Sequence, residues 1–138
     1  MPAESVTTAL AMMQRDRASE ALGMIVLVSE PGQAVVRMSI RDDMLNGFGI
    51  THGGIIFALA DTAFAIACND SDRVTVSAGA DITFLKSTTS GDVLTATAVK
   101  RAQSGRSGIF DVQVLDADGA IVAEFRGRSR RTNTPAPI

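Results

Sequence analysis

The chain contains no tryptophan, no tyrosine, one cysteine and one histidine among its 138 residues. Without the two aromatic types that best stack bases, and with a net charge of −2, binding to nucleic acid or to an anionic membrane is not expected. One cysteine cannot form an internal disulfide, and no long apolar signal segment opens the sequence, so we expect a cytoplasmic location. The same scarcity excludes a zinc site of cysteine and histidine ligands, and no cofactor is predicted.

One apolar stretch near the middle dominates the pattern. Between Gly53 and Cys68 the only charged residue is Asp61, and no polar stripe is present. A helix that is apolar on every side belongs in a core. A stretch this short, with a carboxylate in its middle, is not suited to span a membrane. The sequence therefore predicts a buried central helix over residues 52–69, with Thr51 as its N-cap.

Strand patterns surround this predicted helix. Apolar and polar residues alternate between turn dipeptides, which is typical of hairpins and predicts a mostly antiparallel sheet. A six-stranded sheet curled around the helix would cover it on nearly all sides and leave one flank for a second copy. We predict a single α+β domain over residues 1–138, with an N-terminal helix within residues 1–20 and a loose tail over residues 132–138. The predicted strands are 22–29, 33–41, 74–85, 92–103, 107–115 and 120–130.

Asp61 is the first candidate for chemistry. Burying an ionised acid in so apolar a helix is unfavourable unless the acid has a hydrogen-bonding or charged partner or serves a function. Asp61 is therefore either a structural acid with such partners or a catalytic group. His52 is the only histidine, and Gly53 and Gly54 after it let another group approach the free N–H groups of the helix. No Gly-x-Ser-x-Gly motif is present, so a Ser-His-Asp triad is not predicted. Asn46 begins a turn dipeptide, and formation of the turn alone would explain this residue. The alternative is that its side-chain amide orients water or a carbonyl group.

Helix geometry separates two of these groups. Gly53 and Asp61 are eight residues apart, which is about 12 Å along one helix axis. If both act in one reaction, they come from different subunits, and two antiparallel central helices across a two-fold axis would bring them together. An acid and free N–H groups suit hydrolysis of a thioester. Asp61 would act as general base on water or attack directly, and the N–H of Gly53 would stabilise charge on the carbonyl oxygen.

The motif residues resemble a known family. Asn46, the His-Gly-Gly of residues 52–54 and the Ala-Asp-Thr-Ala-Phe of residues 60–64 are similar to those of the hot-dog acyl-CoA thioesterases, most closely the phenylacetate-degradation, PaaI-type branch. The likeness continues through residues 81–85, 91–98 and 125–129, covers roughly residues 20–131, and shows no departure at the motif positions.

This resemblance implies a hot-dog dimer, usually paired into a homotetramer, that cleaves aryl- or hydroxyarylacetyl-CoA. It implies Asp61 as base or nucleophile and the Gly53 N–H as the oxyanion donor. Asn46 and His52 would position water and the thioester, and Thr62 would support Asp61. A hot-dog hydratase or dehydratase and a non-catalytic acyl-CoA-binding protein are the alternatives.

The remaining candidates concern the substrate. CoA carries several phosphate charges, so basic groups are expected near the mouth of the site. The acyl pocket is expected to use aromatic side chains or the N-terminal helix, with Gly54 allowing close approach. The arginines between residues 126 and 131 are interpreted as the solvated face of an edge strand. The candidate substrate contacts are Gly54, Phe48, Phe84, Lys86, Lys100, Arg101 and Arg106.

Overall fold

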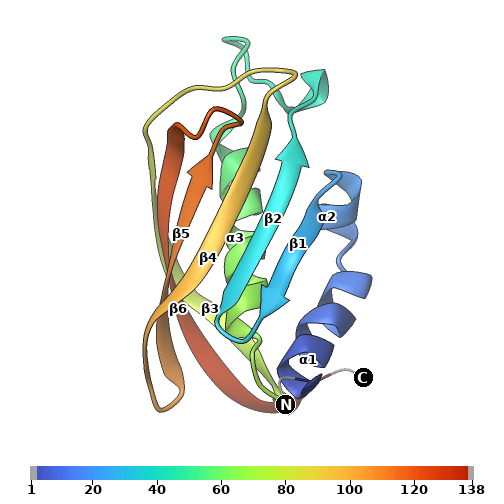
Figure 1. Ribbon diagram of the computed structural model, residues 1–138, viewed down its shortest axis with the longest axis vertical. Coiled ribbons are helices and arrows are strands. Elements are labelled where there is room, and N and C mark those ends of the chain that lie inside the picture. Colours follow the sequence, from blue (N-terminus) through green and yellow to red (C-terminus); the bar gives the residue numbers. More distant parts are fainter. Residues whose placement is uncertain (1–2, 137–138) are drawn as a thin grey trace.

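The computed structural model describes residues 3–136, with side chains from residue 8 onward. Over these residues a six-stranded sheet curls around one long helix, and two shorter helices lie beside it (Figure 1). In chain order the elements are α1 (Ala3–Gln14), α2 (Arg17–Ala21), β1 (Ile25–Glu30), β2 (Gln33–Ser39), the 3-10 turn η1 (Asp42–Met44), α3 (Gly53–Cys68), β3 (Arg73–Phe84), β4 (Val93–Ser104), β5 (Ser107–Leu115) and β6 (Ile121–Pro135).

The strand order in the sheet is β1-β2-β4-β5-β6-β3, and each neighbouring pair is antiparallel. Hairpins connect β1 to β2, β4 to β5 and β5 to β6, whereas α3 follows β2 and carries the chain across the sheet to β3. As a result β3 lies at the edge opposite β1, with β6 on one side only. The predicted α+β architecture, a mostly antiparallel six-stranded sheet around a central helix, is confirmed.

Aromatic rings join α3 to the sheet. Phe64 of α3 lies edge-on to Phe110 of β5, with ring centroids 5.6 Å apart, and 5.8 Å from the ring of Phe125 on β6. A side chain at Gly127 would stand 2.7 Å from the Phe64 ring. Glycine at this position therefore lets the ring rest on the backbone of β6, which fixes the depth at which α3 sits in the sheet.

The start of α3 differs from the prediction by one residue. His52 is the N-cap, and its side chain makes no capping hydrogen bond. Thr51, the predicted cap, instead places its hydroxyl 2.7 Å from the hydroxyl of Thr88, a residue distant in the sequence. A threonine with a long-range partner is no longer available to cap its own helix, so the prediction of Thr51 was wrong.

Both predicted chain ends also need correction. The helix predicted within residues 1–20 is two helices, because Asp16 interrupts it and its carboxylate accepts a first-turn N–H of α2. The tail predicted from Thr132 is not loose as far as Pro135, since β6 continues there and pairs with β3. Pairing with an edge strand thus overrides the polar composition of this segment.

One flank of α3 is left uncovered. Gly54 is exposed, and Ala58, Asp61 and Ala65 are half-buried at successive helical turns, whereas Leu59 on the other side is buried. This is the open flank expected of a helix enclosed by one curled sheet. In the range 3–136 no helix is both long and apolar enough to cross a bilayer.

Candidate active site

The N-terminus of α3 presents free amide groups. The N–H of Ile55 donates to the His52 carbonyl oxygen at 2.9 Å, while those of Gly53 and Gly54 find no acceptor within residues 3–136. The first N–H groups of a helix carry partial positive charge and favour an anionic partner. Two donors for a developing negative charge are therefore available at this end of α3.

Phe84 explains why position 53 is a glycine. The Cβ of any other residue there would stand 3.1 Å from Cζ of the Phe84 ring. Glycine lets the ring, at the end of β3, close against the backbone while the N–H stays uncovered. The contact also ties the helix N-terminus to the strand at the sheet edge.

The predicted site residues near the N-terminus of α3 line two cavities. The first, of about 350 Å³, is lined by Asn46, Gly53, Phe84 and Lys86 among others. The second, of about 290 Å³, is lined by His52 and Gly54. Each cavity is lined by one of the first two residues of α3, so the fold brings the predicted Asn-His-Gly-Gly group to the N-terminus of this helix.

Asn46 has a defined orientation. Its side-chain oxygen accepts hydrogen bonds from the N–H of Phe48 (2.9 Å) and of Ile50 (3.4 Å), which closes the loop before α3. Because the oxygen is occupied, the Asn46 NH₂ group is the part left to act on a ligand, as a donor. Phe48 itself is 90% exposed at the loop tip.

Asp61 lies apart from this group on the open flank of α3. Its carboxylate is half-buried and forms no hydrogen bond or ion pair with a side chain of residues 8–136 or with the backbone of residues 3–136. Burial raises the pKa of Asp61 above its ordinary value. The eight-residue interval to Gly53 keeps the acid about 12 Å away along the same helix. One chain alone therefore does not bring the acid to the free N–H groups.

Thr62 faces the N-terminal helices and not Asp61. Its hydroxyl lies 2.8 Å from the Ala58 carbonyl oxygen and 3.1 Å from the Ser19 hydroxyl of α2. Ser19 in turn donates to the Asp16 carboxylate at 2.6 Å. The Thr62 and Asp61 side chains share no hydrogen bond, so a direct support of Asp61 by the Thr62 hydroxyl stays a prediction.

The predicted phosphate contacts separate into two kinds. Lys86 is bound to Asp116, and Lys100 is bound to Asp70 at 2.6 Å with its ammonium over an aromatic ring. Arg101 and Arg106 are exposed and form no ion pair with a carboxylate among the side chains described, those of residues 8–136. The two arginines are therefore free to meet a phosphate, and the two lysines are already neutralised.

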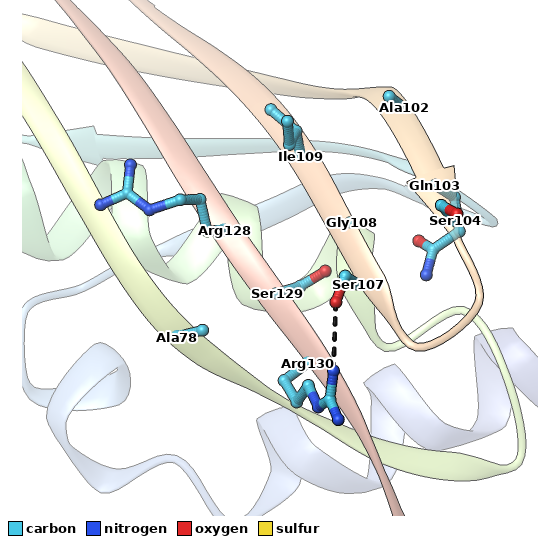
Figure 2. A pocket seen from close by; sticks show the side chains of 10 residues that line it. All are labelled: Ala78, Ala102, Gln103, Ser104, Ser107, Gly108, Ile109, Arg128, Ser129 and Arg130. Atoms are coloured by element: carbon cyan, nitrogen blue, oxygen red, sulfur yellow. Dashed lines mark hydrogen bonds between the residues drawn. The ribbon is translucent and has the colours of Figure 1, made fainter.

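Sequence reasoning missed a cavity of about 500 Å³ beside the β4–β5 hairpin. Figure 2 shows Arg128 and Arg130 of β6 with Ser107 of β5 on the face of the sheet away from α3, where Arg130 donates to the Ser107 hydroxyl at 3.2 Å. The alternation of Arg128 and Arg130 in the sequence was the signal that could have indicated this cavity. The edge-strand interpretation was wrong, since β6 lies between β5 and β3.

A curled antiparallel sheet around one long helix, with the helix N-terminus open to a cavity, defines a hot-dog-fold protein. Residues 48–123 match the family model described as the thioesterase superfamily. The chain is 42% identical over 121 residues to the acyl-coenzyme A thioesterase PaaI of Escherichia coli K12, covering 88% of this chain and 86% of that protein. The chain belongs to the thioesterase superfamily, and the predicted enzyme class, thioester hydrolase, is confirmed.

Solved structures agree with this assignment. The structure of the E. coli PaaI protein from the phenylacetic acid degradation operon matches with a TM-score of 0.93 and 39% identity over 97% of both chains. A Streptococcus mutans protein solved with acetyl CoA matches with a TM-score of 0.77 and 25% identity, over 81% of this chain and 90% of that one. The resemblance to the PaaI-type branch is confirmed.

Proposed function

We propose that this thioester hydrolase acts on acyl-CoA, with aryl- or hydroxyarylacetyl-CoA as its substrates, at sites shared between two subunits. The single observation that carries the proposal is the arrangement on α3. An unpaired, half-buried acid lies on the open flank, and unpaired N–H groups lie at the N-terminus of the same helix. The similarity to E. coli PaaI supports the substrate class.

The edge of the sheet formed by β3 supports a dimer. β3 has a neighbour on one side only, and Val76, Phe84 and Leu85 at or just after this strand are 45–57% exposed. A second copy that pairs antiparallel with β3 would satisfy this edge and extend the sheet. The two α3 helices would then run side by side in opposite directions, with each Asp61 near the other copy's Gly53. Two such dimers would form the expected tetramer.

The reaction follows from this pairing. The thioester carbonyl oxygen accepts from the Gly53 N–H, which stabilises the negative charge that develops as oxygen attacks the carbon. Asp61 removes the proton from the attacking water. Alternatively, its carboxylate attacks the thioester carbon directly and forms an anhydride that water then cleaves. The carbon–sulfur bond breaks, and the CoA thiolate leaves and takes up a proton. The raised pKa makes the Asp61 carboxylate a stronger base than an ordinary aspartate.

Asn46 and His52 complete the site in this proposal. The Asn46 NH₂ group donates to the substrate or to the attacking water, because its oxygen is already bound within the loop. His52 is exposed beside Gly54 and orients the thioester.

The CoA phosphates are assigned to the β4–β5 hairpin. This hairpin lies at the same end of the molecule as the C-terminus of α3 (Figure 1), which is the end towards which the second copy's Gly53 would point. Arg101 and Arg106 form no ion pair there with the side chains of residues 8–136, and Arg130 with Ser107 lines the adjacent cavity. Replacing Arg130 by Gln should raise KM for acyl-CoA and leave kcat unchanged; an unaltered KM would remove Arg130 from the phosphate site.

The central test is Asp61→Asn, assayed by thiol release from a panel of acyl-CoA esters. We expect turnover to be nearly abolished in a correctly assembled oligomer, and near-normal turnover would refute the role of Asp61. Hydration of crotonyl-CoA without thiol release would favour a hydratase. Tight acyl-CoA binding without either reaction would favour a binding protein. After a single turnover in heavy-oxygen water, label in Asp61 would show the anhydride route, because water that cleaves the anhydride at the Asp61 carbonyl carbon leaves its oxygen in the protein.

A further inference from the structure

The loop that carries His52 and Gly53 is fastened to a second loop by a buried pair of threonines. The Thr51 N–H donates to the Thr88 carbonyl oxygen at 2.8 Å, and the two hydroxyl oxygens are 2.7 Å apart. Thr51 is 5% exposed and Thr88 is 4% exposed. Buried hydroxyls paired in this way hold their backbones in a fixed relation, because breaking the pair would leave polar atoms without water or a partner.

A further hydrogen bond and one ring contact reinforce this fastening. The hydroxyl of Thr89 donates to the Gly49 carbonyl oxygen at 2.9 Å. Phe84, four residues before Thr88, lies against Gly53. The end of β3 and the segment after it therefore contact the active-site loop at Gly49, Thr51 and Gly53.

We propose that Thr88 is a positioning residue for thioester hydrolysis, holding Thr51 so that the Gly53 N–H points at the carbonyl oxygen. The inference rests on the proposed function. An oxyanion donor is effective only within about 2.7–3.1 Å of the charged oxygen. A displacement of about 1 Å in a catalytic group is enough to slow a reaction about a hundredfold. Thr51 is two residues before Gly53, so a rotation of the loop at Thr51 moves the N–H directly.

The chain offers a matched control in Thr75. This threonine is also buried, at 8% exposure, but its hydroxyl has no hydrogen-bond partner in the described residues. Thr75 lies on the part of β3 that adjoins the C-terminus of α3, away from the Thr51–Thr88 pair. Replacing either threonine by valine removes one buried hydroxyl and keeps the shape of the side chain.

The experiment compares Thr88→Val, Thr88→Ser and Thr75→Val by thiol release from phenylacetyl-CoA, after the oligomeric state of each has been checked. For Thr88→Val we expect kcat to fall about tenfold or more, with KM within about twofold of wild type, because the donor is misaimed while the substrate still binds. Thr88→Ser keeps the hydroxyl and should recover kcat to within about threefold. Thr75→Val should match wild type.

Three results would overturn the inference: wild-type kcat in an assembled Thr88→Val enzyme, equal loss in Thr88→Ser, or equal loss in Thr75→Val. If Thr88→Val does not assemble, Thr51→Val removes the same hydroxyl pair from the other side, and an unchanged kcat there would equally overturn the inference. Failure of the proposed function is distinct, since the wild-type enzyme would then release no thiol from any acyl-CoA.

Discussion

A methyl group at position 53 would press on the ring of Phe84. The Cβ of an alanine there would stand 3.1 Å from Phe84 Cζ and 3.5 Å from Cε2, so the ring must shift by a few tenths of an ångström. Phe84 is 50% exposed, and its ring therefore has space to move outward. Alanine also favours a helix over glycine by up to about 1 kcal/mol. We expect Gly53→Ala to fold, with a free energy of unfolding within about 1 kcal/mol of wild type.

Activity should respond much more than stability. The methyl group and the displaced ring both crowd the N–H that holds the carbonyl oxygen. Loss of one oxyanion donor lowers kcat by about 100- to 1,000-fold, and a displaced donor by less, so kcat/KM for phenylacetyl-CoA should fall about 10- to 100-fold. Gly47→Ala is the matched control, because a Cβ there meets no described atom within 4 Å. Wild-type kcat/KM in Gly53→Ala, or an equal loss in Gly47→Ala, would refute the reasoning.

Four further predictions concern ionisable groups. Burial raises the pKa of Asp61, so kcat/KM should fall as the pH drops through that raised value, and a flat acid limb would contradict the role of Asp61. The same shift means that stability contributed by protonated Asp61 is lost as the pH rises through its folded pKa; Asp61→Asn should therefore raise the urea midpoint at pH 7 but not in acid. Asp70→Asn breaks the pair with Lys100, whose side chain is a third exposed, and should lower the free energy of unfolding by about 2 kcal/mol in urea titrations. Burial raises the pKa of Cys68 to about 12, so the native protein should not react with a thiol reagent at pH 8 until it unfolds.

Local pattern was sufficient to predict the parts of the fold that depend on neighbouring residues. The unbroken apolar stretch around Asp61 predicted α3, and period-two alternation between turn dipeptides predicted the strands. The same residues predicted that one chain cannot bring Asp61 to Gly53. These inferences need only helix and strand geometry.

The remaining features depend on partners that are distant in the sequence. Thr51 looked like a helix cap, but its hydroxyl is paired with Thr88, 37 residues away. Lys100 was predicted to contact a CoA phosphate, and its ion pair with Asp70, 30 residues away, was not predicted. No periodicity encodes which strand becomes the edge, so the alternating arginines were assigned to an edge strand although β6 lies between β5 and β3. Tertiary pairing decided each of these cases.

The shared site makes a prediction about mixtures of two damaged chains. Asp61→Asn lacks the acid and Gly53→Ala impairs the donor, so each homodimer has two defective sites. A heterodimer of the two variants combines an intact Asp61 from one chain with an intact Gly53 from the other, and so contains one complete site and one doubly defective site. Random pairing of equal amounts makes half of the dimers heterodimers, which restores about a quarter of the wild-type sites.

The measurement is thiol release after the two variants are unfolded together and refolded, compared with each variant refolded alone. Recovery well above the sum of the two separate activities requires that the acid and the N–H come from different chains. If the mixture has only the summed activity, although heterodimers are shown to form, then each chain carries a complete site. Asp61 would in that case have to act with groups of its own subunit, although the fold places it two helical turns from the only free N–H groups of α3 among residues 3–136.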